Sequence, residues 1–462
     1  MLFSASITSC NSAENMLKGH YGPSSYVNSL FINVRNIIET YINRFSQSTY
    51  MISEENLLNL LDAWNLWSHD IETGVERTQC IKRIKPLLER KEILIIKGIR
   101  RSGKSTIMRQ IMKHLLMEGI GKEQLLYLNM EDYNLKDSLQ LGLLEKTLKV
   151  YEENIKKNGK TYFFIDEVQM IPEWERFLRT LYDLKRDIKF IVSGSNASLL
   201  SKELATKLTG RNLTIQIRTL NFSEFRDFKK KADIDEFFTY GGFPEVVLER
   251  DVSKKKILLQ QYFEDIINKD VLARHSIRNS EVVFDLARYL IENSGRKQSM
   301  NKLSKALGID DKTAHEYISY MIDAYLIIKV PFFSYSVKKR FNRMTQPKYY
   351  SADNGFMQIT SLHFTDDLGK FFENAVLLEI AGKANDVAYW SDKSEVDFVY
   401  ERRAVNATIA KEVPKREFDG LSEFRQKHKQ FEVLVVSKKG TVANTDINTV
   451  SFRDFSSELA LP

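Results

Sequence analysis

Eight residues near the end of the chain's first quarter constrain the fold more than any other feature. They read Gly-Ile-Arg-Arg-Ser-Gly-Lys-Ser at 98–105 and fit the pattern G-x-x-x-x-G-K-[ST]. In that pattern glycines let the backbone curl, so that its N–H groups point inward at an anion. The string follows the apolar run 93–96 and precedes a helical stretch that begins near Thr106. A strand, this loop and a helix in that order predict a phosphate-binding loop at the N-terminus of the helix.

A second string supports the first. The apolar run 162–165 ends in Asp166 and Glu167, sixty-two positions after Lys104. We expect Lys104 to reach the terminal phosphates, and Ser105 and Asp166 to hold magnesium. Glu167 is expected to orient the attacking water, with a helix-capping or solvent-facing carboxylate as its alternative role. The residues expected to bind the nucleotide are Gly98, Arg100, Arg101, Ser102, Gly103, Lys104, Ser105, Thr106 and Ser195.

Polar positions that follow later strands extend the candidate site. Ser195 lies just after the apolar run 188–192, and a small polar group there can hydrogen-bond the γ-phosphate, orient water or simply cap a helix. Arg211 precedes the β-rich run 213–220. It could act as an arginine finger, in cis or across a subunit boundary, or it could be a salt-bridged surface residue.

These strings, together with Trp174 and Gly-Gly-Phe-Pro-Glu at 241–245, recur in this order in a known family. The chain resembles the AAA-like P-loop ATPases of archaea and bacteria that carry a fused C-terminal winged-helix and restriction-endonuclease-like region. The resemblance runs from about residue 51 to near residue 440. It implies ATP and Mg²⁺ as cofactors, a helical lid after the ATPase domain, and a homo-oligomer in which Arg211 would act between subunits.

The fold class expected is α/β. Apolar runs of five to eight residues alternate with helical stretches, which is typical of a parallel sheet covered on both faces. The expected strands are 93–96, 125–130, 162–166, 188–193 and 213–220. The expected domains are an extension of uncertain status at 1–50 with Met51 as an alternative start, a P-loop ATPase domain with an N-terminal helical lead at 51–225, a helical lid at 226–294, a winged-helix module at 295–352, and a degenerate restriction-endonuclease-like domain at 353–462.

Residues 295–350 contain a helix-turn-helix candidate. Ser299 and Asp310 are placed to cap two helices, Gly308 makes the turn, and strands are expected at 327–333 and 348–351. This segment holds eleven Lys or Arg against four Asp or Glu, an excess equal to the net charge of the whole chain, +7. The excess favours contact with the backbone of double-stranded DNA, with protein docking as the alternative. The expected DNA contacts, on the wing, are Lys338, Lys339, Arg340 and Arg343.

The last hundred residues resemble the restriction-endonuclease-like fold. In that fold a helix glutamate, a strand aspartate and an E-x-K pair on the next strand support metal-dependent cleavage. Glu373, Asp397 and Lys411 fit three of these positions, but Ile409 replaces the acid two residues before the lysine. Because the loss of a carboxylate weakens the binding of a hard cation, we expect a vestigial nuclease site.

Composition limits the remaining classes of protein. No run of eighteen apolar residues exists, so no membrane span is expected, and residues 1–12 lack the positively charged leader of a secretory signal. Two cysteines, Cys10 and Cys80, suit a reducing cytoplasm. The sequence therefore predicts a cytoplasmic ATPase that couples nucleotide state to its C-terminal modules. The alternatives are a DNA-tethered regulator that uses ATP only as a ligand, and a nuclease licensed by ATP.

Overall fold

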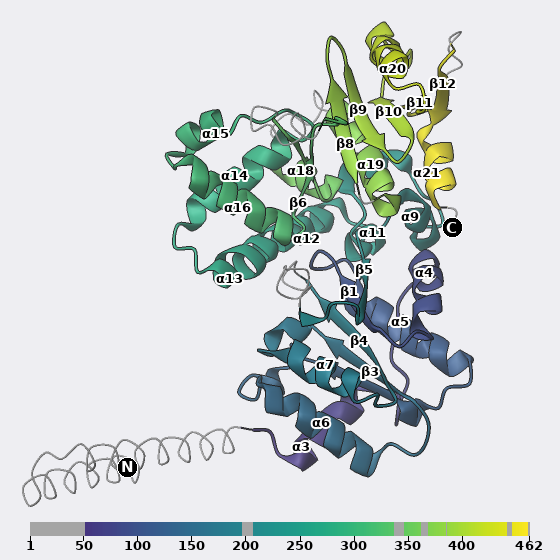
Figure 1. Ribbon diagram of the computed structural model, residues 1–462, viewed down its shortest axis with the longest axis vertical. Helices are drawn as coiled ribbons and strands as arrows, with labels where there is room; N and C mark the ends of the chain where they lie inside the picture. Colours follow the sequence, from purple (N-terminus) through teal and green to yellow (C-terminus); the bar gives the residue numbers. More distant parts are fainter. Residues whose placement is uncertain are drawn as a thin grey trace, which may run out of the picture.

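Five parallel strands form the sheet that carries the phosphate-binding loop (Figure 1). The computed structural model describes residues 51–195, 207–336, 346–361, 368–384, 386–440 and 446–460, so the extension 1–50 and the wing residues Lys338, Lys339, Arg340 and Arg343 lie outside the described part. The strands are β1 (Ile93–Lys97), β2 (Leu125–Asn129), β3 (Thr161–Asp166), β4 (Ile188–Gly194) and β5 (Asn212–Gln216). Each corresponds to an apolar run that predicted it.

The order of the strands in this sheet is β2-β3-β4-β1-β5. It places β4 between β1 and β3, so the carboxyl ends of these three strands lie side by side. The glycine-rich loop follows β1, Asp166-Glu167 lies at the end of β3, and Ser195 follows β4. Strand order therefore brings together three segments that are far apart in the sequence, which is where ligands bind in open parallel sheets.

Helices cover both faces of this sheet. Alternate residues of each strand point to opposite faces, so that Ile93 and Ile95 join one core while Leu94 and Ile96 join the other. The first core lies under α3 (Glu54–Trp64), α6 (Leu141–Asn154) and α7 (Trp174–Asp183), and the second under α4 (Thr78–Leu88) and α5 (Lys104–Met117). The short helices η1 (Lys122–Gln124), η2 (Tyr133–Leu135) and η3 (Val168–Met170) complete this part.

β5 is shorter than the expected strand 213–220. It ends at Gln216, although the backbone N–H of Ile217 still donates to the carbonyl of Lys97 at 2.7 Å. Beyond that point the chain leaves the sheet, and the N–H of Leu220 donates to Gly242 at 2.7 Å. The apolar pattern continues because Ile217 packs with α4 and α5, and Leu220 packs with the helices that follow.

The next part is helical. Its helices are α9 (Phe222–Phe228), α10 (Ile234–Tyr240), α11 (Pro244–Leu248), α12 (Val252–Asp265), the π-helix η5 (Ile266–Leu272), α13 (Ala273–His275) and α14 (Ser280–Glu292). The following module comprises α15 (Met300–Leu307), α16 (Asp311–Asp323) and the antiparallel pair β6 (Ile327–Val330) and β7 (Lys348–Ser351). Side chains from α12, η5, α14, α16 and β7 share one hydrophobic core. The boundary expected at 294/295 therefore does not separate two cores.

The two helices expected on either side of Gly308 are present as α15 and α16. The Asp310 side chain accepts a hydrogen bond from the N–H of Thr313 at 3.0 Å and so caps α16. Gly308, with φ of 66°, ends α15 in the left-handed region that favours glycine. Ser299 occupies the N-cap position of α15, but its side chain makes no capping hydrogen bond.

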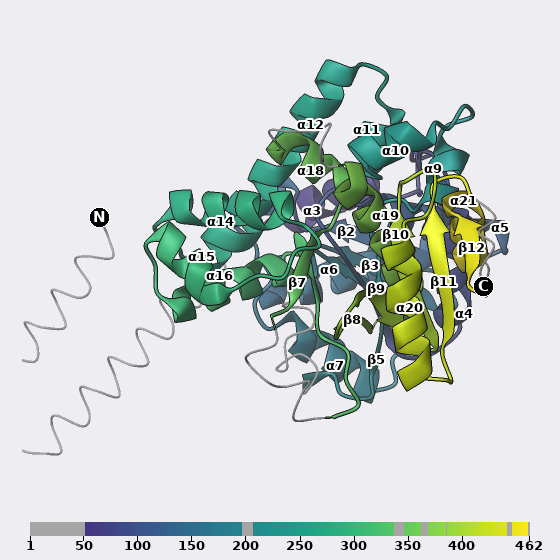
Figure 2. The same cartoon turned by 90° about the horizontal axis from the view of Figure 1, so that it is seen from above.

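A second, mixed sheet forms the C-terminal part, with strand order β12-β11-β10-β9-β8. β8 (Val387–Ser391), β9 (Glu395–Tyr400) and β10 (Arg403–Thr408) are antiparallel neighbours, and β11 (Glu432–Ser437) and β12 (Asn448–Ser451) continue from β10 in parallel. The helices of this part are α18 (Asn354–Thr360), α19 (Leu368–Lys383), α20 (Lys415–Lys427) and α21 (Phe452–Ala460). Seen from above, α14, α15 and α16 lie away from α20 and α21 (Figure 2).

Phenylalanines join α9 and α10 to this C-terminal part. The ring of Phe238 lies 5.4 Å from that of Phe372 and 4.9 Å from that of Phe452, measured between centroids. Phe222 also packs on Phe452, at 5.6 Å. The C-terminal sheet is thus packed onto the helices that follow β5. Among the described residues, no helix combines the length and the apolar character that a membrane crossing requires.

Candidate active site

The glycine-rich loop has the backbone geometry of a tight anion cradle. Gly103 has φ of 91° and directly precedes α5, so the first N–H groups of that helix open toward the loop. Arg101 has φ of 66°, a left-handed conformation that non-glycine residues adopt rarely and mostly at functional sites. Gly98 is required for packing, because a Cβ there would lie 1.9 Å from the carbonyl oxygen of Ile217. The loop is therefore held by the chain that leaves β5.

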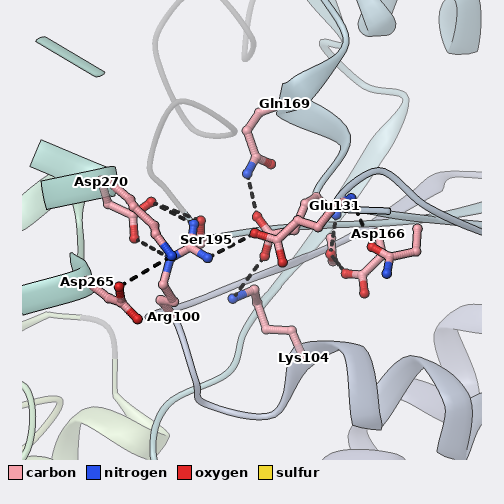
Figure 3. Close-up of polar contacts among 12 residues, drawn as sticks. Arg100, Lys104, Glu131, Asp166, Gln169, Ser195, Asp265 and Asp270 are labelled. Carbon is pink, nitrogen blue, oxygen red and sulfur yellow. Dashed lines mark hydrogen bonds and ion pairs between the residues drawn. The ribbon is translucent and has the colours of Figure 1, made fainter. Parts of the chain in front are cut away.

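Lys104 lies inside the loop and is almost fully buried. Its Nζ donates to the carbonyl oxygen of Ile99 at 3.3 Å and lies 3.6 Å from Oε1 of Glu167 (Figure 3). The separation from Glu167 exceeds a normal hydrogen bond, so this pair attracts electrostatically without a fixed hydrogen-bond geometry. The ammonium is thus positioned between the loop and the end of β3.

Asp166 is held by two hydroxyl groups. The hydroxyl of Tyr127 donates to Oδ2 at 2.6 Å, and Ser193 Oγ donates to Oδ1. Burial, together with the neighbouring Asp166, raises the pKa of Tyr127 well above its ordinary value, so the phenol remains a donor. Ser193 also accepts the N–H of Glu167 at 2.9 Å. The end of β4 therefore fixes both acids at the end of β3.

Glu167 adopts a left-handed backbone conformation, with φ of 54° and ψ of 47°. Its side chain is 9% exposed. Although burial favours the neutral acid, Lys104, Gln169 and Arg100 hold the pKa of Glu167 below its ordinary value. Glu167 is therefore ionised at neutral pH, as a residue that accepts a proton or orients water must be.

Residues of the helical part close this site from the other side. Arg100 Nε donates to Asp270 Oδ2 at 3.0 Å, and its Nη1 donates to Glu131 Oε1 at 3.0 Å. Ser195 Oγ donates to the other oxygen of Asp270 at 3.3 Å. Asp270 belongs to the π-helix η5, a rare form that is frequent at functional sites. The loop and the end of β4 are thus joined to the helical part through one aspartate.

Arg274 was not anticipated from the sequence. It lies in α13, where Asp270 and Glu167 act on it electrostatically. Its Nη1 is buried and has no hydrogen-bond partner among the described residues. Burial lowers the pKa of Arg274, and the two acids offset this only in part. A buried guanidinium nitrogen without an acceptor is costly, so this position suits an anion.

The remaining loop residues have different surroundings. Arg101 is exposed, and its guanidinium lies 5.4 Å from the centroid of the Tyr262 ring. Ser102 is buried, and its Oγ has no hydrogen-bond partner among the described residues. Ser105 and Thr106 lie in the first turn of α5 and are half-buried. Buried hydroxyl groups of this kind suit phosphate oxygens as acceptors.

The residues present fit ATP and magnesium. Ser105 offers a hydroxyl oxygen and Asp166 a carboxylate, the oxygen ligands that Mg²⁺ prefers. Lys104, Arg100 and Arg274 supply positive charge from three different elements. The sequence-predicted residues at 98–106, 166–167 and 195 are therefore gathered at one edge of the sheet.

Arg211 does not lie with them. Its carbonyl accepts the N–H of Ile93 at 2.8 Å, at the amino end of β1, whereas Lys104 follows the carboxyl end. A five-residue strand separates these two ends by about 15 Å. The Arg211 side chain pairs with Asp183, with Nε 2.8 Å from Oδ1. The prediction of a finger acting in cis is therefore wrong for this geometry, because the strand lies between the arginine and the loop.

The expected C-terminal residues are only partly brought together. Glu373 in α19 and Asp397 in β9 both contact the ammonium of Lys348 in β7. Lys411 is exposed and lies three residues past the end of β10. The prediction that Lys411 completes this cluster is therefore corrected. The position on β10 that meets Asp397 is Ala407, whose N–H donates to Oδ2 at 2.9 Å.

Comparisons with known proteins agree with the fold of the first sheet. A family model described as an AAA domain matches residues 90–226, and a model described as a domain of unknown function matches residues 231–366. An uncharacterized protein of Methanocaldococcus jannaschii is 35% identical over 334 residues, which are 67% of this chain and 72% of that protein. An uncharacterized protein of Haemophilus influenzae is 29% identical over 368 residues, 75% of this chain and 89% of that protein.

Similar solved structures include a RuvB of Thermotoga maritima, with a TM-score of 0.29 and 16% identity over 56% of this chain and 90% of that one. AMPPCP-bound DnaA from Aquifex aeolicus has a TM-score of 0.27 and 14% identity over 56% of this chain and 91% of that one. TM-scores this low support no conclusion about what this chain binds.

The strand order, the loop and the AAA-domain match together define an AAA-like P-loop ATPase fold. Within that class, the chain belongs to the same family as the Methanocaldococcus jannaschii protein.

Proposed function

We propose that this chain is a magnesium-dependent ATPase that couples its nucleotide state to its C-terminal region. The observation that carries the proposal is the convergence of Lys104, Asp166 and Glu167 at the carboxyl ends of β1 and β3, which flank β4 in the sheet. An ammonium, a metal-binding carboxylate and an ionised second carboxylate are the groups that phosphoryl transfer to water requires.

Each residue has a separate role in hydrolysis. Lys104 and the N–H groups of the loop would bind the β- and γ-phosphates and offset the charge that develops there. Magnesium, when bound, neutralises phosphate charge, and Ser105 and Asp166 are the residues that would hold it. Glu167 would orient water for in-line attack on the γ-phosphate. Arg274 would donate its buried Nη1 to the same phosphate.

The string Gly-Gly-Phe-Pro-Glu offers a route from this site to the C-terminal region. A Cβ on Gly103 of the loop would lie 3.7 Å from the ring of Pro244. Two residues earlier, the N–H of Gly242 donates to Oδ2 of Asp353 at 2.8 Å. Only glycine fits at 241, because a Cβ there would lie 1.7 Å from Oδ1 of Asp353. Asp353 follows β7 directly, so movement of the loop would reach the β6–β7 pair through this contact.

The partner of the C-terminal region is proposed on charge alone. The excess of basic residues at 295–350 supports contact with the backbone of double-stranded DNA, through a winged-helix module made of α15, α16, β6 and β7. The C-terminal sheet would be a degenerate restriction-endonuclease-like domain. The use of cysteine, with Cys80 buried as a thiol, supports a cytoplasmic location.

The test is release of phosphate from ATP with magnesium, by the native chain and by Glu167→Gln. We expect the variant to bind ATP and to lose about 10²- to 10⁴-fold in rate, because a neutral amide cannot accept a proton. Glu173→Gln is the matched control, since Glu173 is an exposed glutamate near the same segment that pairs with Arg176. Equal rates for native chain and Glu167→Gln would show that Glu167 has no such role.

Addition of duplex DNA to the same assay tests the coupling. Stimulation of the native rate, absent in Glu167→Gln, would support a DNA-coupled ATPase. Binding of ATP and DNA without hydrolysis would favour the regulator that uses ATP only as a ligand. Indifference to DNA would favour a protein partner for the C-terminal region.

Arg211 is proposed to act between subunits of a homo-oligomer. Mixing Arg211→Ala with Glu167→Gln subunits tests this role, because some mixed interfaces combine the intact Glu167 of one subunit with the intact Arg211 of its neighbour. We expect the mixture to regain part of the activity that both variants lack alone. A mixture as inactive as its components would contradict action across a subunit boundary.

A further inference from the structure

Three carboxylates of the C-terminal part surround one buried ammonium. Lys348 Nζ lies 2.7 Å from Glu395 Oε1, 3.6 Å from Glu373 Oε1 and 3.8 Å from Asp397 Oδ1. The Lys348 side chain is 3% exposed. The acids come from α19 and β9, whereas the lysine is the first residue of β7, in a different sheet. Glu395 and Asp397 are two residues apart on one strand and therefore point to the same face.

The second oxygens and the neighbours of these acids are also held in place. Glu395 Oε2 pairs with Lys297 at 2.7 Å, and Asp397 Oδ2 accepts the N–H of Ala407 at 2.9 Å. The hydroxyl of Tyr350 donates to Glu373 Oε1 at 2.7 Å. One oxygen from each of three carboxylates is thereby directed at a single point. Such a set of hard anionic oxygens is the donor chemistry of a divalent cation site.

The centre of this set is filled by the protein itself. Three carboxylate oxygens within 3.8 Å of Nζ stabilise the ammonium of Lys348 against the cost of burial. The lysine therefore remains a cation at neutral pH. A divalent cation at the same centre would be repelled by this ammonium at contact distance, and both could not share the three oxygens.

We infer that the acidic pocket of Glu373, Glu395 and Asp397 is a divalent-cation site whose cation has been replaced by the ammonium of Lys348. The metal that a restriction-endonuclease-like fold implies does not fit here while Lys348 is in place. The three acids instead hold the first residue of β7 by ion pairs. Because Asp353 lies two residues after β7 and accepts the N–H of Gly242, these ion pairs also help to fix the segment that leads back to the glycine-rich loop.

The experiment uses the full chain without nucleotide and Mn²⁺ as the probe, measured by calorimetry and by melting temperature. Lys348→Met removes the ammonium and keeps the length of the side chain. We expect it to melt below the native chain, to regain several degrees with Mn²⁺, and to bind one Mn²⁺ about tenfold or more tightly than the native chain. Lys348→Arg keeps the cation and should show no such gain.

Asp397→Asn identifies the site of any binding. In the Lys348→Met background it should abolish the gain in Mn²⁺ affinity, because one of three ligands becomes neutral. In the native background it should change Mn²⁺ binding little, and this comparison holds even where Lys348→Met does not fold. The inference is overturned if the native chain binds Mn²⁺ and Asp397→Asn removes that binding, or if folded Lys348→Met binds Mn²⁺ no better than the native chain.

Discussion

Two buried lysines, one in each half of the sequence, differ in the number of carboxylates that surround them. Lys104 has one carboxylate at 3.6 Å and one carbonyl oxygen at 3.3 Å. Lys348 has three carboxylate oxygens between 2.7 and 3.8 Å. Their side chains are almost equally buried, so burial alone does not distinguish a ligand-binding lysine from a structural one. The number and distance of the nearby carboxylates distinguish the two lysines. A lysine whose positive charge is already neutralised by carboxylates attracts an anionic ligand weakly.

The backbone around each lysine differs in the same sense. Lys104 follows Gly103, which is left-handed, in a loop with a second left-handed residue, Arg101. Lys348 begins a strand whose Tyr349 and Tyr350 are fully buried. Strained backbone is retained where binding compensates for it, whereas packed strands favour one fixed state. We therefore expect replacement of Lys104 to reduce ATP hydrolysis and replacement of Lys348 to reduce stability.

The largest effect is expected for Lys104→Met in the phosphate-release assay. We expect hydrolysis to fall by about 10³-fold, because the cation that offsets charge on the γ-phosphate is lost. The melting temperature should change less than in Lys348→Met, since one carboxylate rather than three loses its cation. Lys149→Met is the matched control, because Lys149 is an exposed lysine that pairs with Glu54. Hydrolysis of ATP at the native rate by Lys104→Met would contradict the ligand-binding role of Lys104.

Lys348→Met should show the reverse pattern. Three partly buried carboxylates lose their common cation, and the cost to the free energy of unfolding should be about 3 kcal/mol, measured by denaturant unfolding. The affinity for ATP should stay within about twofold of native, because no residue of the nucleotide site contacts this pocket. A loss of ATP binding without a loss of stability would contradict the structural role assigned to Lys348.

Glu379 extends the comparison to a buried acid whose hydrogen-bond donors are neutral groups rather than a lysine. The variant that tests it is Glu379→Gln. Burial raises the pKa of Glu379 to about 7, although the N–H of Phe222 and the hydroxyl of Ser456 both donate to it. The folded state therefore holds the proton more tightly than the unfolded state. Its contribution to stability is complete below about pH 4.5 and is lost as the pH rises toward 7.

We therefore expect Glu379→Gln to be more stable than the native chain at pH 8, by about 2 kcal/mol, and nearly equal to it at pH 5. Melting temperatures measured across this range provide the test. Glu458→Gln, at an exposed glutamate that pairs with Arg403, should leave the pH dependence unchanged. A difference that is the same at both pH values would show that the carboxyl of Glu379 does not titrate in this range.

The smallest effect is expected for Arg274→Ala. Loss of a guanidinium from the lid side should reduce hydrolysis about tenfold, since Lys104 and the loop still bind the phosphates. Binding of ADP should change less than binding of ATP, because only the γ-phosphate is within reach of α13 in this proposal. Arg288→Ala, which removes an exposed arginine of α14, is the control. Equal loss for ADP and ATP would place Arg274 away from the γ-phosphate.

The local parts of the site could be predicted from the sequence, and the distant parts could not. The loop at 98–105 lies within one strand–loop–helix unit, and Asp166-Glu167 ends a buried strand, so each local geometry follows from the residues around it. Strand order adds Ser195, because parallel strands end at a common edge. Asp270 and Arg274 lie on helices, and the sequence pattern of these helices indicates only which of their faces is buried. Their position depends on how the helical part packs on the sheet.

The C-terminal cluster shows the same limit. Glu373 and Asp397 were identified from a helix and a strand, but the lysine was sought on the strand after Asp397. The lysine that contacts them lies forty-nine residues earlier, in β7, and is brought there by packing between two sheets. The sequence left the role of Arg211 open. Because Arg211 precedes β5, it lies at the amino edge of the parallel sheet, opposite the glycine-rich loop, and its side chain pairs with Asp183.

The central claim is that the loop at 98–105 binds a nucleoside triphosphate together with magnesium. Equilibrium binding of a fluorescent ATP analogue with magnesium, by the native chain and by Lys104→Met, tests it most directly. The account predicts saturable binding by the native chain, competed by ATP, and a large loss of affinity in the variant. Absence of binding to ATP or GTP by the folded native chain, or equal binding by the variant, would contradict it.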